Sequence, residues 1–219
     1  MLDPVVAVDR LRAAFRGPEK HRTLHAKGRF YAGTFTATPE AAALGRALHL
    51  TGESVPVLVR WSNAGGNADV PDTLPDIRGM AVKFRLPDGT ATDLLGQTAR
   101  RFPTDDPEMF VRMTEASRRM ATFPLFMLRH PSMAPALLDG LRNGAVPKPA
   151  SFVEPSYYPI HAYGWRDADD RLSWVRYVLV AQPGEPPAGS FAGPDRVFDE
   201  MAARLARAGA LRGTTPGRR

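Results

Sequence analysis

The chain has 219 residues, of which 43% are apolar and 24% are charged, and its 29 Lys and Arg exceed 23 Asp and Glu to give a net charge of +6. This composition is typical of a folded globular protein and excludes an intrinsically disordered chain. The absence of cysteine excludes disulfide scaffolds, thiolate nucleophiles and cysteine-ligated metal centres. No apolar run reaches the roughly 20 residues that span a bilayer, so we expect a soluble, cytoplasmic protein.

The basic charge is concentrated near the C-terminal end. From residue 196 onward there are six arginines and two acidic residues, which leaves +4 of the net +6 in this segment. An arginine-rich terminus is usually a solvated helix with a frayed end. We therefore expect neither a nucleic-acid partner nor a membrane partner.

The first part of the chain predicts an arm that leads into a strand. Residues 1–24 have loosely helical apolar spacing and end in a polar run, and we assign them to an N-terminal arm. The alternation at 28–36 is rich in aromatic and β-branched side chains and predicts the first strand. Thr38 and Pro39 then supply an N-cap and a first-turn proline for a short helix that reaches about Leu50.

The next segment predicts three further strands. One strand covers 55–62 and is followed by a long surface loop at 63–76. Strands at 78–86 and 90–98 flank the pair Asp88-Gly89, which is a strong hairpin signal. These strands are therefore expected to pair antiparallel.

The second half predicts helices, another hairpin and a last helix. Short helices run through an insert at about 105–143. Strands at 157–165 and 171–181 form the second hairpin. A Pro/Gly-rich linker covers 182–194, and a helix at 195–208 ends at a glycine before the basic tail.

Together these elements predict an α+β fold in which an antiparallel sheet curves toward a barrel. We divide the chain into the arm at 1–24, a core at 25–181 that includes the helical insert, and a C-terminal part at 182–219.

Common catalytic motifs are absent: the sequence has no P-loop, no G-x-G-x-x-G after a strand, no H-E-x-x-H and no G-x-S-x-G. Among the histidines, His49 and His130 are predicted to end helices, where an imidazolium complements the helix dipole. His161 is predicted to be half-buried within a strand. His25 differs because it directly precedes a strand that begins with Gly28, where a glycine lets another group approach the backbone.

Three separated motifs stand out in the first half of the chain. They are His-Ala-Lys-Gly at 25–28 with Gly33-Thr34-Phe35 and Thr38-Pro39-Glu40, then Val59-Arg60-Trp61-Ser62, and then Asp76-Ile77-Arg78-Gly79-Met80-Ala81-Val82-Lys83-Phe84. In this order they resemble the catalases and the smaller catalase-related haem peroxidases. The resemblance covers roughly 20–120, and the 157–179 hairpin is more weakly similar to the next barrel strands. It implies a catalase-like antiparallel β-barrel, complete or incomplete, with flanking helices.

The resemblance also implies haem b as cofactor, and reduction of hydrogen peroxide or organic peroxides by an unidentified reductant, in the response to oxidative stress. His25 matches the distal acid/base, which takes a proton from peroxide and returns it to the leaving oxygen. Ser62 matches the hydroxyl that orients this imidazole. Arg22 and Arg60 match contacts to the haem propionates. Phe102 matches the aromatic ring that lies against the distal haem face.

Each of these residues also has a plain structural interpretation. Ser62 could be an ordinary strand hydroxyl, Arg22 and Arg60 could be surface arginines, and Phe102 could be a core aromatic. The family motif favours the functional interpretation.

The chain departs from the family at the distal amide. Gln97 stands where the family has an asparagine, so the amide is kept on a side chain that is one methylene longer. That places the amide about 1.5 Å deeper by standard geometry. A displacement of this size favours weak peroxidase chemistry over fast dismutation.

A second departure concerns the iron ligand, which the family draws from a tyrosine on a helix beside an arginine. The last of the five tyrosines here is Tyr177, and none has this setting, so we identify no metal ligand in the sequence. We expect a shortened or frameshifted reading frame, which the DNA downstream of codon 219 would test. A substitute ligand from His161 or from a partner subunit is the alternative.

Three functions therefore remain open. The leading hypothesis is a haem peroxidase of the catalase-related type. The others are a non-catalytic remnant or binding module with exposed strand edges, and dehydration of fatty-acid hydroperoxides. The sequence leaves a homo-oligomer open as well.

Overall fold

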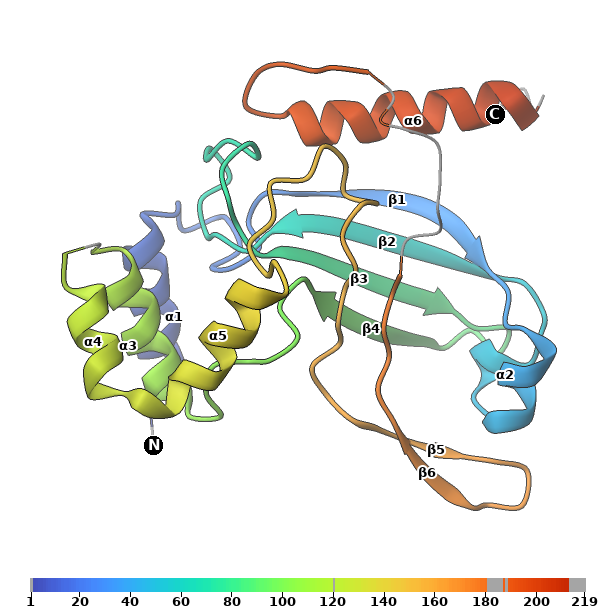
Figure 1. The fold of residues 1–219 in the computed structure, drawn as a ribbon. Coiled ribbons are helices and arrows are strands. Elements are labelled where there is room, and N and C mark those ends of the chain that lie inside the picture. Colours follow the sequence, from blue (N-terminus) through green and yellow to red (C-terminus); the bar gives the residue numbers. More distant parts are fainter. Residues whose placement is uncertain (1, 120, 181–186, 188, 213–219) are drawn as a thin grey trace.

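The computed structural model describes residues 2–119, 121–180, 187 and 189–212 (Figure 1). Parts of the predicted linker and the whole tail from residue 213 lie outside the described residues. The helices are α1 (Pro4–Phe15), α2 (Pro39–Leu44), α3 (Pro107–Ser117), α4 (Phe123–Arg129), α5 (Ala134–Arg142) and α6 (Arg196–Arg212), with 3-10 turns η1 (Leu48–Leu50) and η2 (Pro131–Met133). The strands are β1 (Gly28–Phe35), β2 (Val55–Asn63), β3 (Arg78–Arg85), β4 (Ala91–Gln97), β5 (Tyr163–Arg166) and β6 (Leu172–Val175).

The centre of the fold is an antiparallel sheet with the strand order β1-β2-β3-β4. All four predicted strands are confirmed to within one residue at each end. The predicted hairpin between β3 and β4 is also confirmed. Its turn residue Gly89 has a φ of 82°, and the Asp88 carboxylate accepts hydrogen bonds from the N–H and the hydroxyl of Thr90.

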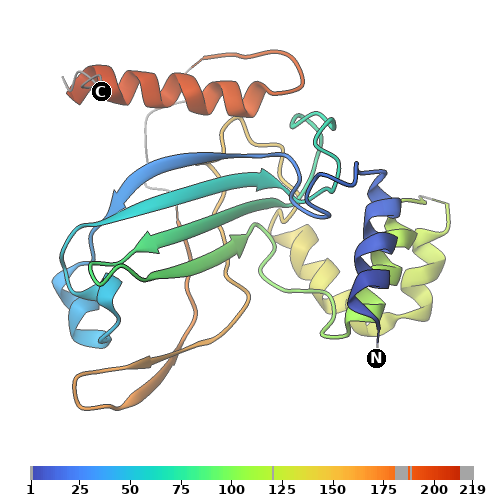
Figure 2. The same ribbon diagram turned by 180° about the vertical axis from the view of Figure 1, so that it is seen from behind.

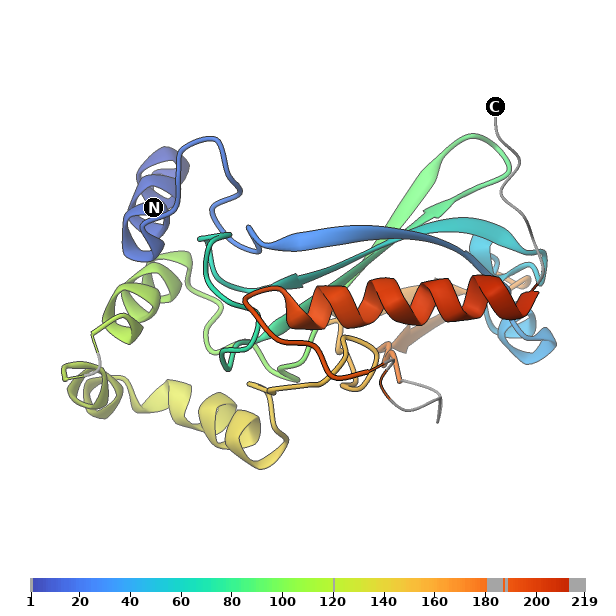
Figure 3. The ribbon, with the colours of Figure 1, turned by 90° about the horizontal axis from the view of Figure 1, so that it is seen from above.

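Helices pack at one end of the sheet and along one side of it. The helices α1, α3 and α4 gather at the end where β2 and β4 finish, whereas α6 lies alongside β1 and β2 (Figures 1 and 2). Seen from above, α6 runs along the length of the sheet (Figure 3). No described helix has both the length and the apolar content to cross a membrane.

The sheet stays open within the described residues. Beyond β4 it continues only as single bridges, from Gln97 to Tyr158 and from Tyr157 to Leu179. The α+β architecture with antiparallel pairing is as predicted, but the described part of the chain forms an open sheet and a separate β5-β6 ribbon rather than a closed barrel.

The second hairpin is shorter than the prediction of 157–165 and 171–181. A regular ladder forms only between β5 and β6 within the described residues. Tyr157 pairs with Leu179 in a single bridge, as the predicted hairpin requires, whereas Tyr158 bridges to Gln97 of β4. Pro159 has no N–H with which to extend a ladder between the Tyr157 bridge and β5. The base of the hairpin is held by side chains, since Trp165 Nε1 donates a 2.8 Å hydrogen bond to the Tyr177 hydroxyl.

Two predicted helix ends and two histidine environments were wrong. The helix predicted to reach Leu50 ends at Leu44, because Gly45 adopts an extended conformation and η1 follows separately. The last helix does not end at Gly209 but continues to Arg212. His49 lies in the short 3-10 turn η1 rather than at the end of an α-helix; its ring stacks on Phe84 with 4.7 Å between the ring centres, and burial lowers its pKa, which disfavours the imidazolium. His161 is exposed and lies outside the strands.

One face of the sheet carries the core. Alternate residues of β2, β3 and β4 are buried against Tyr163, Tyr177 and Leu179; they are Val55, Val57, Val82, Phe84 and Leu94. Further along the same face, Tyr31 and Trp61 pack on a second cluster built from α6 and the segment before β5; it consists of Phe152, Val197, Phe198 and Met201. The opposite face is therefore left free of the core.

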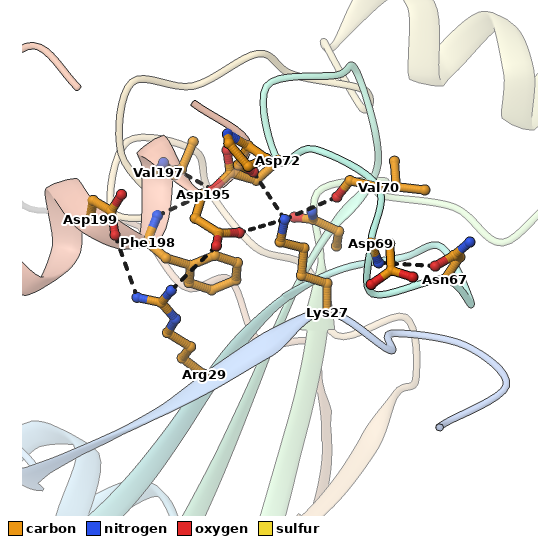
Figure 4. Close-up of polar contacts among 12 residues, drawn as sticks. Lys27, Arg29, Asn67, Asp69, Val70, Asp72, Asp195, Val197, Phe198 and Asp199 are labelled. Atoms are coloured by element: carbon orange, nitrogen blue, oxygen red, sulfur yellow. Dashed lines mark hydrogen bonds and ion pairs between the residues drawn. The ribbon is translucent and has the colours of Figure 1, made fainter. Parts of the chain in front are cut away.

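A loop from the middle of the chain caps the N-terminus of α6. Asp72 is fully buried, and its Oδ2 accepts hydrogen bonds from the N–H groups of Val197 at 2.9 Å and Phe198 at 3.3 Å (Figure 4). Helix N-termini carry unpaired N–H groups, and a carboxylate there satisfies them and complements the helix dipole. Burial nevertheless raises the pKa of the Asp72 carboxyl.

Lys27 reinforces the same junction. Its ammonium group lies 2.6 Å from the Asp195 carboxylate and donates hydrogen bonds to the carbonyl oxygens of Val70 and Pro194 (Figure 4). Arg29 adds a cation–π contact, with its guanidinium 5.0 Å from the centre of the Phe198 ring. The start of α6 is thus tied to the segment just before β1 and to the 63–76 loop.

Replacing Asp72 with alanine should lower the free energy of unfolding by about 2 kcal/mol, because two buried N–H groups of α6 lose their acceptor. Urea unfolding followed by circular dichroism measures this loss. Asp69→Ala, an exposed carboxylate in the same loop, is the control and should change stability by less than about 0.5 kcal/mol. Equal effects of the two variants would contradict a capping role for Asp72.

Candidate active site

The backbone of His25 is fixed by its conformation and by two hydrogen bonds. It has a left-handed conformation with a φ of 53°, which is uncommon for a residue other than glycine. Its N–H donates to the Ala64 carbonyl at 2.9 Å, and its own carbonyl accepts a 2.8 Å hydrogen bond from Arg60. These two hydrogen bonds, at the N–H and at the carbonyl of His25, therefore fix the direction in which its side chain leaves the backbone.

The His25 side chain lies on the sheet face that is free of the core. Its Nδ1 shares a 3.0 Å hydrogen bond with Ser62 Oγ. A Cβ placed on Gly79 would lie 2.6 Å from His25 Cε1 and 2.7 Å from Nδ1, so the ring occupies the space that a side chain at this position of β3 would need. Within the described residues Nε2 has no hydrogen-bond partner, and this nitrogen is left for a ligand.

A row across the sheet brings the predicted residues together. Gly28 pairs with Ser62, Ser62 with Gly79, and Gly79 with Gln97. Residues that pair directly across strands point to the same face, at Cβ separations of roughly 5 Å. Gln97 is therefore one strand away from the glycine that carries the His25 ring. Ser62 and Gln97 were predicted as site residues, and Gly28 was predicted as a position of close approach. The role of Gly79 was not predicted.

The next row on the same face forms an apolar platform. Phe30 pairs with Arg60, Arg60 with Ala81, and Ala81 with Leu95. Phe30 is 58% exposed and Leu95 is 62% exposed, and both lie in the row next to that of Ser62 and Gly79. Neither Phe30 nor Leu95 was predicted as a site residue from the sequence. Their signal was the alternation of each strand, which places them on the face of Ser62 and Gln97.

Arg60 is the cation built into this platform. It is only 8% exposed; its guanidinium lies 5.6 Å from the centre of the Phe30 ring and fills the space above Gly28, where a Cβ would lie 2.5 Å from it. Burial lowers the pKa of Arg60, and the charge of the exposed Arg22 nearby lowers it further. Both predicted arginines thus lie around His25.

These surroundings keep His25 neutral. Burial, and then the charges of Arg60 and Arg22, lower the pKa of the imidazole to about 4. The ring is therefore an unprotonated base at neutral pH. A general base needs this protonation state and a free nitrogen within reach of its substrate.

The structure places Phe102 apart from this group. Its ring packs on Phe110 of α3, with 5.0 Å between the ring centres, and has no contact with His25. It lines a separate hollow of about 410 Å³ together with His161 and three arginines, which are Arg100, Arg101 and Arg176. The assignment of Phe102 to the distal haem face stays a prediction.

None of the tyrosines contacts His25 within the described part of the chain. Tyr31 packs on Trp61 on the core face, and the buried Tyr157 donates its hydroxyl hydrogen to the Phe152 carbonyl. Tyr163 and Tyr177 belong to the core of the second hairpin. Tyr158 pairs with Gln97 and so continues the row, with Arg100 donating to its hydroxyl at 3.2 Å.

Replacing Gly79 with alanine should displace the His25 ring and break its hydrogen bond to Ser62. The expected loss of stability is about 1–3 kcal/mol, because a methyl group enters an occupied space. Gly33→Ala is the matched control, since its Cβ would meet its nearest atom at 3.7 Å. Urea unfolding together with the ¹⁵N chemical shifts of the imidazole checks both effects. An unchanged Nδ1 signal in Gly79→Ala would contradict the contact.

The low pKa of His25 predicts a pH dependence of stability. Because the native pKa is about 4 and the unfolded value is near 6.5, the unfolded chain binds a proton first as the pH falls. The contribution of His25 is thus complete above pH 6.5 and is lost between 6.5 and 4. Relative to His25→Asn, the wild type should lose up to about 1.4 kcal/mol per pH unit across this window.

The comparison with His25→Asn cancels the contributions of the buried Asp72 and the half-buried Asp76, whose raised pKa values act in the opposite direction. Asparagine also tolerates the left-handed conformation of this position. Urea unfolding at pH 7.5 and 5, with an NMR titration of the ring, measures the effect. A His25 ring that ionises near pH 6.5 would show that the site is solvated.

Comparisons with known proteins identify the family of the chain. The chain matches the model of the Catalase family over residues 1–187. It is 43% identical over 210 residues to the catalase-related peroxidase of Mycolicibacterium paratuberculosis, which covers 93% of this chain and 67% of that protein. It is 31% identical over 173 residues to the catalase-related peroxidase of Synechococcus elongatus, which covers 75% of this chain and 50% of that protein.

Solved structures show the same fold. A fungal catalase crystal structure superposes with a TM-score of 0.71 at 21% identity, covering 94% of this chain and 44% of that chain. A bacterial catalase gives a TM-score of 0.64 at 23% identity, covering 81% and 36%. The chain thus spans about one half to two thirds of the peroxidases it matches. With its family motifs gathered around one imidazole and its fold shared with solved catalases, the chain belongs to the catalase family.

Proposed function

We propose that this chain carries the acid/base side of a haem b peroxidase that acts on hydrogen peroxide or organic peroxides. The observation that supports this most directly is the neutral His25 imidazole, fixed through Nδ1 and free at Nε2. A cytoplasmic location, an unidentified reductant and a homo-oligomeric assembly complete the proposal.

The residues around His25 fit a haem group. An apolar, exposed platform of Phe30 and Leu95 suits the flat hydrocarbon surface of a porphyrin. Arg60 and Arg22 lie beside it and would hold the propionates, since guanidinium groups bind carboxylates well in partly buried sites. Bound haem would supply an iron that activates the peroxide bond.

The chain's own residues then handle the proton. His25 Nε2 would take a proton from one peroxide oxygen and return it to the other as that oxygen leaves, so that the imidazole ends neutral. Ser62 would keep the ring in place through Nδ1, as an outer hydrogen-bond partner does.

Gln97 would orient the peroxide through its side-chain amide. It lies on the same row as Ser62 and on the same face as the ring. The longer side chain moves the amide by about one bond length relative to an asparagine. Since catalysis is sensitive to such displacements, we propose slow peroxidase turnover rather than fast dismutation.

The test is to express the chain with a haem supply and to record its visible spectrum and its consumption of peroxide. His25→Ala should keep its Soret absorption but lose at least about 100-fold in peroxide turnover, because general acid–base catalysis contributes about that much. Thr34→Ala, an exposed change on β1 away from the imidazole, is the control and should retain full turnover.

Unchanged turnover in His25→Ala would refute the acid/base role. A colourless wild-type protein after haem supply would refute haem binding by this chain and favour a non-catalytic binding module with open strand edges. A parallel assay with a lipid hydroperoxide, with analysis of its products, distinguishes reduction from dehydration.

A further inference from the structure

A second cavity lies away from His25, between α1 and the α3–α4 pair. Its volume is about 1030 Å³. These helices form the end of the molecule opposite α2 (Figure 2). We call this cavity the arginine cleft, after the six arginines among its lining residues: Arg10, Arg16, Arg112, Arg118, Arg119 and Arg129.

One of these arginines holds the cleft together. Arg10 of α1 bonds to Glu115 at 2.7 Å and to Glu108 at 2.8 Å, both on α3. These bonds cross between the two walls, so the helices are fixed relative to each other. Arg10 is thereby neutralised, and so is Glu115, the one acidic residue in the lining of the cleft.

The other five arginines form no ion pair within the described residues. They come from the end of α1, from α3 and from the helical segment that follows it; they are Arg16, Arg112, Arg118, Arg119 and Arg129. The pKa of Glu115 is lowered first by its hydrogen bond with Arg10, and the charges of Arg112 and Arg119 nearby lower it further. Positive charges around one concave surface raise the local potential together. At physiological ionic strength, salt screens the interactions between such charges mainly at separations beyond about 8 Å.

The cleft also has aromatic surfaces beside these charges. The Arg118 guanidinium lies 5.3 Å from the centre of the Phe15 ring on α1, a cation–π contact. Phe126 and His130 pack together at 4.4 Å on the α4 side. A planar group that enters the cleft would find rings on both walls.

We propose that the arginine cleft binds the oligophosphate group of a small molecule, either a nucleoside triphosphate or inorganic polyphosphate. Five guanidinium groups that form no ion pair within the described residues line one cavity, which favours an anion with several charges in a small volume. The planar guanidinium group also matches the geometry of phosphate oxygens. The charges of an acidic peptide are spaced more widely along an extended chain. This site shares no residue with the His25 site, so the inference is independent of the proposed function.

Calorimetric titration of the full chain with sodium tripolyphosphate and with ATP, at about 0.15 M salt, tests this proposal. Both should bind saturably, and Arg112→Ala with Arg119→Ala should weaken each by about 100-fold, since each lost charge-assisted contact is worth about tenfold. Arg142→Ala, an exposed arginine on α5 outside the cleft, is the control and should bind as the wild type does.

Comparing ATP with tripolyphosphate distinguishes a nucleoside triphosphate from polyphosphate as the natural ligand. Tighter binding of ATP than of tripolyphosphate, lost in Phe126→Ala, would identify a nucleotide, whereas equal binding would identify polyphosphate. The proposal is overturned if neither ligand binds below millimolar concentration, if Arg142→Ala weakens binding as much as the cleft variants, or if a glutamate-rich peptide or single-stranded DNA binds more tightly than both.

Discussion

The candidate site depends on the direct contact between the His25 ring and the backbone of Gly79. Because Gly79 has no Cβ, the imidazole lies on β3 itself, and Ser62 of the neighbouring strand is then within hydrogen-bond reach. The same placement partly buries the ring and sets it near Arg60, and both effects lower the pKa of the imidazole. Ring position, hydrogen bonding and protonation state thus share one physical cause.

The two faces of the sheet are used differently, and one loop connects them. The core face is covered by α6 and the second hairpin, whereas the other face keeps Phe30 and Leu95 exposed in the row next to that of Gly79. The 63–76 loop supplies Ala64, which accepts from the His25 backbone, and Asp72, which caps α6. Docking of the last helix and positioning of the base are therefore linked through the same loop.

The arginines described above differ in the groups to which they are bonded. Arg78 is fully buried, and its guanidinium donates to Asn63 and to two loop carbonyls, so it acts as a structural centre of the loop. Arg60 is buried beside the platform with one bond to a backbone carbonyl. Of the six arginines that line the cleft, only Arg10 forms an ion pair in the described structure, so the charge of the other five is available to a ligand.

The sequence by itself determined the four central strands, the turn at Gly89 and the family motif around His25, because alternation, turn residues and short motifs are local properties. It did not determine the length of the second hairpin, the stacked position of His49 or the exposure of His161. Nor did it show that the row of paired residues seats an imidazole on Gly79. Only the tertiary structure decided these points, because each depends on which residues from distant segments meet, and the register between strands sets that.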